Sequence, residues 1–526
     1  MIRVHQVKCD SDDRNVIESH LLRKLNMKPE DLLSWEIHRK SVDARHQKVL
    51  FSYVLDCKVR REKQYLKHKD VMKRPDERYK YVESGEKSLP DHPVVVGFGP
   101  AGMFAALLLA QSGYCPIVFE RGSQVDIRKE KVEGFWNGSE LDEECNVQFG
   151  EGGAGAFSDG KLTTRSKDSR ARKVLEDLVS FGAKEEILID AHPHIGTDAF
   201  LKIIKACRQE IERLGGTFYF DTQVTDIKVE NDQLVGISTT SGDFACQALI
   251  FACGHSASDT ILAFHKKGLQ LTNKPFAVGV RIEHTQDYIN EAMLKEASQD
   301  PRLTPARYQL THMTSNKKGV YTFCMCPGGY VVNSSSKKGQ LVINGMSYAA
   351  RDGINANSAL LVQVNDSDYG NDLFAGLEYQ ENLEKKAYEL SGSYAPCVQL
   401  AKDYLAGKVS TDYEEVKPSC LMGGNFVDLN ELFSPAINQS LHEALLAYEE
   451  KVPGFVERGA ILSAVESRSS SSLKVCRDES LQSNILGLFP CGEGSGYAGG
   501  IMTSAIDGLR CAESLISIFD KNTIKK

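Results

Sequence analysis

Three glycines have the spacing of a site that binds the diphosphate of a dinucleotide. Gly97, Gly99 and Gly102 form the pattern G-x-G-x-x-G within the stretch VVVGFGPAG. The first glycine permits a tight turn, the second lets the backbone approach the phosphates, and the third lets a helix pack closely on a strand. The helix that follows would offer free backbone N–H groups and a partial positive charge to the phosphates.

An acid supports this interpretation. Glu120 ends the next apolar stretch, PIVFE, close to the spacing of about 20 residues that the motif favours. A carboxylate there accepts hydrogen bonds from the adenosine ribose and repels a 2′-phosphate, so NADP is not expected at this site. The alternative is a glycine-rich turn in another kind of α/β protein. The predicted site also includes Pro100, Ala101 and Arg121.

A second glycine-rich stretch, GEGGAGAFSDGK, almost matches a P-loop. From Gly155 it reads G-x-x-x-x-G-K, but the next residue is Leu162 where a P-loop has Ser or Thr to bind magnesium. No clear strand precedes it, so an ATPase is not expected. It resembles instead the loop that lines the cofactor in flavoproteins related to fumarate reductase. Its expected cofactor contacts are Gly152, Gly153, Gly155, Ser158, Lys161 and Arg165.

Two later segments distinguish FAD from NAD. The stretch ALIFACGHSA contains Ala252-Cys253-Gly254, which is similar to the Ala-Thr-Gly turn of flavoproteins with two dinucleotide-binding domains. The stretch LFPCGEGSGYAGGIMTSAIDG resembles their final strand, acid and helix. There Glu493 would face the ribityl and diphosphate region, and the helix N-terminus would face the flavin pyrimidine edge. The expected FAD contacts here are Val224, Ala252, Gly254, Gly492, Glu493, Gly499, Gly500 and Ile501.

Longer stretches resemble one family over nearly the whole chain. They include NVQFGEGGAGAFSDGKLTT, HPHIGTD, AVGVRIEH, FCMCPGGYVV, MSYAARDGINANSALLV and GEGSGYAGGIMTSAIDGLRCAE. They are similar to a bacterial family of largely uncharacterised FAD-dependent dehydrogenases, or NAD(P)/FAD-dependent oxidoreductases. The resemblance implies non-covalently bound FAD, a glutathione-reductase-like FAD fold and an inserted substrate domain. It implies no particular substrate.

The elements that must position these residues predict an α/β protein with a Rossmann-like FAD-binding domain of the ββα sandwich type. We expect a small N-terminal α+β domain with a basic linker (1–88), the first part of the FAD-binding domain (89–275), an inserted α+β substrate or cap domain (276–455) and a C-terminal return to the FAD-binding domain (456–526). Pro90 and Pro93 mark the first boundary.

Catalytic candidates are fewer. His194 could act as a general acid, although a structural histidine is the alternative. Arg281 and His284 are three apart in a predicted strand, so at most one should face the site. Arg351 could clamp an anionic substrate, with Asn355 and Asn357 nearby, or the segment could be a turn.

Composition sets limits on location and partners. The 526 residues are 41% hydrophobic and 25% charged, with a net charge of −8 and 14 cysteines. No apolar run is long enough to span a membrane and no leader pattern is visible, so we expect a cytoplasmic protein without a disulfide framework. The C-x-C pair Cys324 and Cys326 could be a redox dithiol, half a metal site or strand packing, and no metal is expected.

Two functions remain open from the sequence. The first is an FAD-dependent oxidoreductase of a small, anionic molecule, with NAD(P)H as a transient electron donor because there is no second dinucleotide fingerprint. The second is an FAD-containing RNA-modifying or partner-binding protein. Its support is the segment 58–80, where ten basic residues outnumber four acidic ones, and the acidic remainder argues against nucleic acid.

Overall fold

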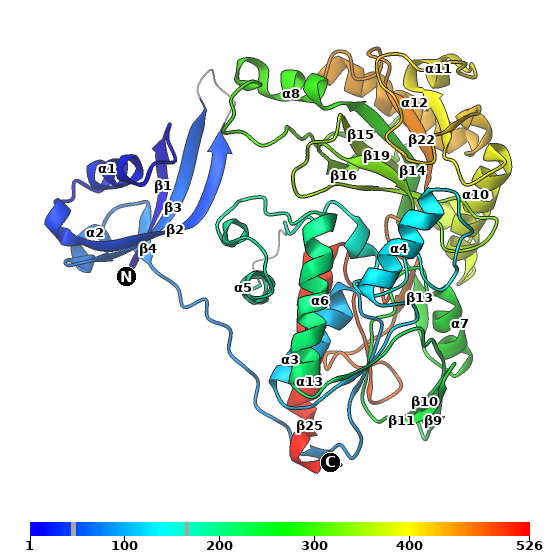
Figure 1. The fold of residues 1–526 in the computed structure, drawn as a ribbon, viewed down its shortest axis with the longest axis horizontal. Helices are drawn as coiled ribbons and strands as arrows, with labels where there is room; N and C mark the ends of the chain where they lie inside the picture. The colour runs from blue at the N-terminus through cyan, green and yellow to red at the C-terminus, as the bar shows by residue number, and fades with distance from the viewer. Residues whose placement is uncertain (44–48, 164–167, 526) are drawn as a thin grey trace.

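The computed structural model describes residues 1–43, 49–163 and 168–525, so Arg165 lies outside the described residues. It places a small N-terminal unit beside a larger body (Figure 1). The larger body contains one parallel sheet and one mixed seven-stranded sheet. Within the described residues, none of the helices combines the length and apolar character needed to cross a bilayer.

The parallel sheet gathers strands that are far apart in the sequence. Its order is β24-β12-β6-β7-β8, and every neighbouring pair is parallel. Because the strands are parallel, all their carboxyl ends lie at one edge. The strands are β6 (Val94–Val96), β7 (Ile117–Phe119), β8 (Thr217–Tyr219), β12 (Leu249–Phe251) and β24 (Leu488–Pro490).

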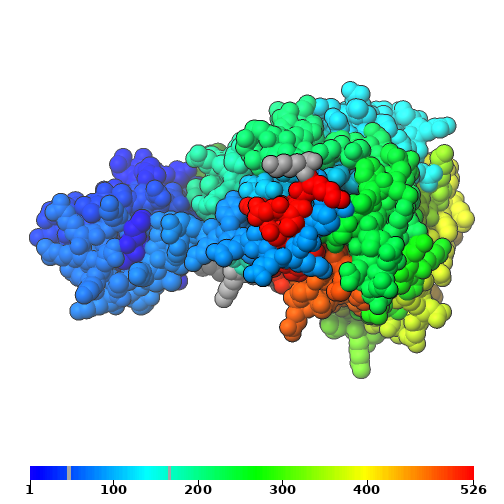
Figure 2. All heavy atoms as spheres, turned by 90° about the horizontal axis from the view of Figure 1, so that it is seen from below, coloured from blue at the N-terminus to red at the C-terminus, as the bar shows by residue number. Residues whose placement is uncertain are grey.

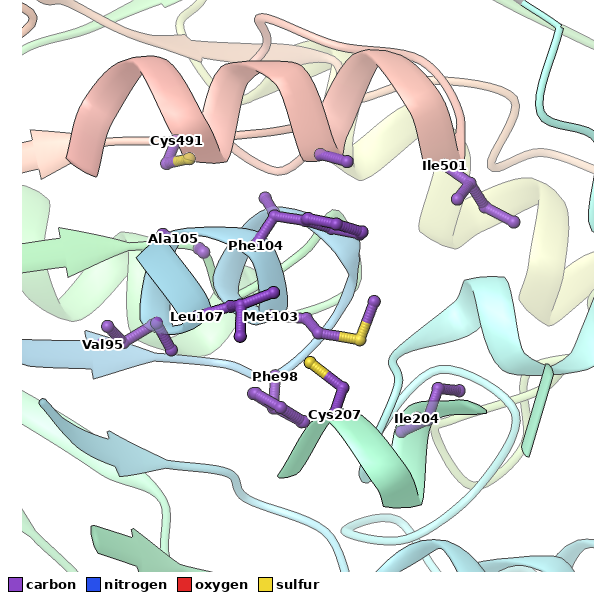
Figure 3. Close-up of a cluster of buried hydrophobic side chains, with 14 of the residues drawn as sticks. Val95, Phe98, Met103, Phe104, Ala105, Leu107, Ile204, Cys207, Cys491 and Ile501 are labelled. Carbon is purple, nitrogen blue, oxygen red and sulfur yellow. The ribbon is translucent and has the colours of Figure 1, made fainter. Parts of the chain in front are cut away.

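A fully apolar helix, α3 (Pro100–Gln111), forms the centre of this part of the protein. All residues from Ala101 to Ala110 are buried, as expected for a helix that is hydrophobic on every side. It packs between α13 (Ile501–Ile518) and α6 (Thr197–Arg213), and Figure 3 shows Phe104 and Leu107 among side chains from both. The glycine motif is therefore anchored on a rigid helix.

A three-stranded antiparallel sheet lies beside the parallel one, in the order β11-β10-β9. Its apolar side chains share a buried cluster with Phe119 and Phe251 of the parallel sheet. These three strands precede the Ala-Cys-Gly turn in the sequence. Their bounds are β9 (Val224–Glu230), β10 (Gln233–Thr239) and β11 (Gly242–Ala245).

The seven-stranded sheet has the order β15-β16-β19-β14-β22-β20-β21 and is mostly antiparallel. Helices α10 (Ala375–Ser391) and α12 (Pro435–Lys451) bury apolar residues in the same cluster as its central strands. The strands are β14 (Phe276–Thr285), β15 (Thr311–Met313), β16 (Gly319–Cys326), β19 (Asn355–Val364), β20 (Cys397–Leu400), β21 (Asn425–Phe426) and β22 (Ile461–Glu466).

Strand β22 corrects one expected boundary. The sequence division places 456–526 with the FAD-binding domain, but β22 pairs with β14 and β20 inside the seven-stranded sheet. Strands that are far apart in the sequence pair through tertiary contacts. An apolar run carries no local signal that shows which strand it will pair with. We therefore place the end of the inserted unit after Glu466.

The N-terminal unit contains a four-stranded antiparallel sheet, in the order β2-β3-β1-β4, and the helices α1 and α2. Helix α1 (Arg14–Leu25) begins after Asp13, whose side chain accepts hydrogen bonds from the backbone of Asn15 and Val16. The unit is therefore of the small α+β type expected for the N-terminal region. The strands are β1 (Ile2–Cys9), β2 (Leu32–Asp43), β3 (Leu50–Val59) and β4 (Val71–Lys73).

This unit projects from one side of the molecule, as Figure 2 shows. Its contacts with the larger body include a backbone hydrogen bond of 2.6 Å from Lys40 N to Ile189 O. A linker then follows the surface to the C-terminus, where β5 (Lys87–Ser88) pairs with β25 (Phe519–Asp520).

The remaining elements complete the connections. Besides the 3₁₀ turns, these are α2 (Glu62–Tyr65), α4 (Val125–Trp136), α5 (Arg170–Ser180), α7 (Ser258–Lys266), β13 (Leu271–Asn273), α8 (Gln286–Leu294), β17 (Tyr330–Asn333), β18 (Ile343–Met346), α9 (Asp366–Tyr369), α11 (Ala401–Ala406) and β23 (Leu473–Val475).

Candidate cofactor and active site

One cavity lies at the carboxyl edge of the parallel sheet, and the chain segments that line it are far apart in sequence. They include the turn after β6, the end of β7, the glycine-rich loop near residue 155, the turn after β12, the ends of β16 and β22, and the loop before α13. The cavity is lined by seventeen of the residues expected to bind the cofactor: Gly97, Gly99, Pro100, Ala101, Glu120, Arg121, Gly153, Gly155, Ser158, Lys161, Val224, Ala252, Gly254, Glu493, Gly499, Gly500 and Ile501.

The two glycine-rich stretches form neighbouring walls of this cavity. A Cβ on Gly153 would lie 2.8 Å from Gly99 Cα, closer than real side chains approach. Gly97 has a φ of +89°, which favours glycine. The near P-loop sequence forms the 3₁₀ turn η2 (Ala154–Phe157) in place of a loop that opens a helix. Both stretches therefore face one ligand volume, and Leu162 is buried outside the cavity lining.

Three of the expected glycines lie behind the wall. A Cβ on Gly102 would lie 1.9 Å from Gly97 O, which is the close helix–strand contact that the motif predicts. A Cβ on Gly152 would lie 2.4 Å from Ile204 Cδ1. A Cβ on Gly492 would lie 2.7 Å from the Ala101 side chain. These residues let the wall pack without lining the cavity themselves.

Glu120 is buried and holds the two loops together. Its Oε2 accepts a hydrogen bond from Phe98 N at 2.8 Å, and its Oε1 accepts from Gly150 N at 2.9 Å and Gly122 N at 3.1 Å. A carboxylate has about four acceptor positions, so one remains free on Oε2. The residue can therefore both fix the loops and accept a hydrogen bond from a ribose hydroxyl.

Two helices direct uncapped N-termini at the cavity. Gly99 precedes α3 and Gly500 precedes α13, and neither helix has a side-chain cap. A Cβ on Gly254, Gly499 or Gly500 would meet no atom within 4 Å, so open space lies in front of these backbones. Free N–H groups and open space fit a ligand with a diphosphate and a second electronegative edge, as FAD has.

Glu493 lies at the start of α13. Gly500 N donates a hydrogen bond of 3.3 Å to Glu493 Oε2. Burial raises the pKa of this carboxyl to about 7, so it changes charge near neutral pH. Glu493 is therefore a titratable group in the wall of the cavity.

The three residues expected to be catalytic do not line the cavity. Arg351 donates from Nη2 to Asp159 Oδ2 at 2.6 Å, so its charge is already paired and is not offered to a substrate. His194 lies behind the glycine-rich loop, where its backbone bridges to Lys161. Burial, with Arg351 nearby, lowers the pKa of His194, which disfavours a role as a proton donor near neutral pH.

Arg281 is fully buried, and its Nε lies 2.5 Å from Glu466 Oε2. His284 is also buried, and its Nε2 lies 2.7 Å from Phe455 O in an aromatic cluster. Burial lowers the pKa of His284 to about 4. Neither residue lines the cavity, whereas the alternation argument allowed one of them to do so. Strand β14 is buried on both faces of its sheet. The alternation argument did not consider that arrangement.

Sequence reasoning missed several polar lining residues. Asp159 and Glu466 are buried acids, and Arg468 pairs with Glu384 at 2.7 Å. Burial, with Arg468 nearby, lowers the pKa of His255 to about 3. Two sequence signals could have identified some of these residues. Asp159 lies within the glycine-rich loop, and His255 directly follows the Ala-Cys-Gly turn. The lining residues with ionisable side chains that the sequence did not assign to the cavity are Asp159, Cys253, His255, Cys324, Glu466, Arg468 and Cys491.

Comparison with known proteins adds the family. Residues 275–469 match a family model described as "FAD-dependent protein, C-terminal domain-like". The chain is 43% identical to an uncharacterized protein of Clostridium beijerinckii over 530 residues, covering 99% of each chain. The chain belongs to this FAD-dependent family. Residues 1–58 of the family member match a domain model of unknown function.

Solved structures show only distant likeness. The quinol fumarate reductase chain of E. coli is 11% identical, with a TM-score of 0.35 over 82% of this chain and 70% of that one. A glycine oxidase from Bacillus cereus is 12% identical, with a TM-score of 0.29 over 81% of this chain and 95% of that one. These TM-scores are too low to carry an argument about this family member. Its site is therefore interpreted from its own residues.

Proposed function

We propose that the protein is an FAD-dependent oxidoreductase that holds FAD non-covalently in this cavity and acts on a small anionic molecule. The observation that carries the proposal is the convergence of three features on one cavity. These are the uncapped N-terminus of α3, the uncapped N-terminus of α13, and Glu120. A dinucleotide such as FAD has a diphosphate, a ribose and an electron-accepting ring, so each of the three features would have a group to bind.

Each feature has a separate task. The free N–H groups at the start of α3 would bind the diphosphate, and Glu120 would accept from the adenosine ribose. The start of α13 would place its partial positive charge where negative charge develops on the reduced ring. Bound FAD supplies two-electron transfer, and the protein orients it and excludes water.

A second hollow suggests where substrate enters. It shares Phe323, Ser469 and Gly499 with the first cavity, so the two adjoin. Its lining includes Lys274, whose ammonium group is half buried, and burial lowers the pKa of that group. A cation in a recess beside the cavity would attract a small anion such as a carboxylate. This replaces Arg351, which is paired with Asp159, as the residue that would bind an anionic substrate.

The electron donor is part of the same proposal. The glycine motif at Gly97–Gly102 forms one wall of the FAD cavity, and the sequence offers no second fingerprint for a permanent nicotinamide site. NAD(P)H would therefore bind transiently and transfer its electrons to the FAD in the same cavity. The adjoining hollow would be its route of approach, because the two spaces share lining residues.

The test is spectroscopic and chemical. Purified protein should show oxidised-flavin absorption, and denaturation should release FAD. Anaerobic bleaching by NADH compared with NADPH, followed by reoxidation by small anionic acceptors, identifies the donor and the substrate class. A Lys274→Gln variant should raise the KM for the anionic acceptor without loss of flavin. Colourless protein that takes up no FAD would end the proposal.

A further inference from the structure

A pair of cysteines at the end of β16 lies where the cofactor cavity meets the adjoining hollow. Cys324 lines the cavity next to Phe323, which lines both spaces. The side chain of Cys326 is buried, whereas that of Cys324 is half buried and reachable from the cavity. The two cysteines are therefore chemically unequal: one is accessible and the other lies directly behind it.

The backbone here is shaped to turn Cys324 toward the cavity. The pairing of β16 with β19 changes register between Phe323 and Cys326, which is the mark of a β-bulge. Cys324 has a φ of +44°, a conformation that non-glycine residues rarely adopt. Bulges often redirect a side chain beside an active site. Packing of the strand alone would not require a β-bulge and a positive φ at Cys324.

Charged groups from four neighbouring segments surround the pair. Lys161 donates from Nζ to Met325 O, between the two cysteines. Arg281 Nη2 lies 3.4 Å from Cys324 O, and its Nη1 lies 4.0 Å from Cys326 Sγ. The acids that face the same space are Asp159, Glu466 and Glu493.

These surroundings favour a thiolate on the accessible sulfur. The Cys326 thiol donates a hydrogen bond of 3.2 Å to the Cys324 carbonyl oxygen. The neighbouring Cys326 thiol has the largest effect on the Cys324 sulfur and acts against burial, with Lys161 and Arg281 adding to it; together they lower the pKa of Cys324 to about 5. The interaction with Cys324, together with burial, raises the pKa of Cys326 well above its usual range. One thiolate beside one protonated thiol is the arrangement of a reactive dithiol.

We propose that Cys324 and Cys326 form a redox-active dithiol that exchanges two electrons with the flavin, an inference that rests on the proposed function. In the oxidising direction the Cys326 S–H bond breaks and one S–S bond forms between the Cys324 thiolate and Cys326. The two electrons and the Cys326 proton pass to oxidised FAD, which becomes the reduced anion. In the reverse direction the reduced anion returns two electrons and one proton, and the pair becomes a thiolate and a thiol again. The accessible Cys324 would exchange with thiol or disulfide substrates that enter through the adjoining hollow.

The oxidation state of the Cys324–Cys326 pair can be measured directly by mass spectrometry. Cleavage after Lys318 and Lys337 yields one peptide that contains Cys324 and Cys326 and no other cysteine. In oxidising glutathione buffer this peptide should lose about 2 Da, the mass of two hydrogens, and regain it in dithiothreitol. The measurement works on FAD-free and FAD-loaded protein alike. A peptide that keeps its mass in every buffer overturns the proposal, and this reading does not depend on whether FAD binds.

Matched variants separate the roles of the two sulfurs. Cys326→Ser keeps a hydrogen-bond donor, so alkylation of Cys324 should keep a low titration midpoint, whereas Cys326→Ala should raise it. Both variants should abolish the mass loss. Cys476→Ser, at a half-buried cysteine outside the cavity lining, should leave both readings unchanged. A wild-type midpoint at the ordinary thiol value of about 8.5 would contradict the assigned thiolate and overturn the proposal.

Electron exchange with FAD has its own readout. In an anaerobic titration of oxidised FAD-loaded protein, wild type should consume about two two-electron equivalents of reductant per flavin, and Cys326→Ser about one. Equal consumption by the two proteins would overturn exchange with the flavin even if the peptide loses mass. Failure to bind FAD would remove the proposed function but leave the mass result readable.

Discussion

Arg281 and Glu466 form an ion pair in the interior of the protein, with 2.5 Å between Arg281 Nε and Glu466 Oε2. Arg281 comes from the centre of the seven-stranded sheet, and Glu466 ends the next strand at the wall of the cavity. Asn357 accepts a further hydrogen bond of 2.6 Å from Arg281 Nη1. A residue expected to touch substrate is instead the link between the inserted unit and the cofactor cavity.

Removing this cation should destabilise the protein. Arg281→Met leaves Glu466 buried without its partner, and such a loss typically costs about 3–5 kcal/mol. We expect a corresponding fall in the free energy of unfolding, measured by urea denaturation. Arg458→Met is the matched control, because Arg458 is half exposed and lies 3.7 Å from Glu291, and its loss should cost under about 1 kcal/mol. Similar costs for the two variants would contradict the structural role.

The close packing of the glycine motif can be tested by adding one methyl group at Gly102. Gly102→Ala would place a Cβ 1.9 Å from Gly97 O, so α3 must move away from the turn. We expect weaker FAD retention and lower stability by at least about 1–3 kcal/mol, the usual cost of overpacking. Gly134→Ala is the control: Gly134 lies in α4, where its Cβ would have a nearest contact of 3.4 Å. That variant should be neutral or more stable by up to about 1 kcal/mol.

Glu120 should matter because both of its carboxylate oxygens accept hydrogen bonds from the backbone of the loops. Glu120→Gln replaces one acceptor oxygen with an NH₂ group that faces backbone N–H donors of the loops. An unsatisfied buried donor costs about 1–3 kcal/mol, so FAD should bind roughly 10- to 100-fold more weakly. Equilibrium dialysis of FAD measures this. Glu130→Gln, on the exposed side of α4, should bind FAD like wild type, and equal affinities for all three proteins would refute the assignment.

Glu493 predicts a pH dependence with a definite sign. Because burial raises its pKa to about 7, the carboxyl is neutral below that pH and negative above it. Its contribution to folding stability is complete below the unfolded value, near pH 4.5, and is lost as the pH rises through about 7. The same new charge repels the anionic diphosphate, so FAD affinity should fall over this range.

A neutral replacement provides the control for that pH effect. The glutamine of Glu493→Gln cannot ionise, so FAD affinity should fall less than in wild type between about pH 6 and about pH 8; burial also raises the pKa of Glu466 in the same cavity wall to about 7, and that carboxyl titrates in both proteins. Fluorescence titration of FAD at each pH measures both proteins. If the variant and wild type lose affinity in parallel, the titrating group is not Glu493.

Local features explain what the sequence alone determined. The G-x-G-x-x-G turn, the apolar strand before it and the apolar helix after it are specified by neighbouring residues, so their position is readable from a short stretch. The same holds for α1, which begins at its Asp13 cap. Chain order and motif spacing also indicated that both glycine loops face one site, and the structure places both at one cavity.

Tertiary structure decided which polar groups reach the cavity. Arg281, Arg351 and His194 are reactive types near motifs, but partners distant in sequence bury or pair them: Glu466 lies 185 residues from Arg281, and Asp159 lies 192 from Arg351. The bulge that exposes Cys324 and the pairing that takes β22 into the seven-stranded sheet are also long-range contacts. Burial and charge pairing depend on such contacts, whereas turns and helices depend on neighbours. The sequence therefore predicted many of the residues that line the cavity, whereas the tertiary structure decided which charged groups reach it.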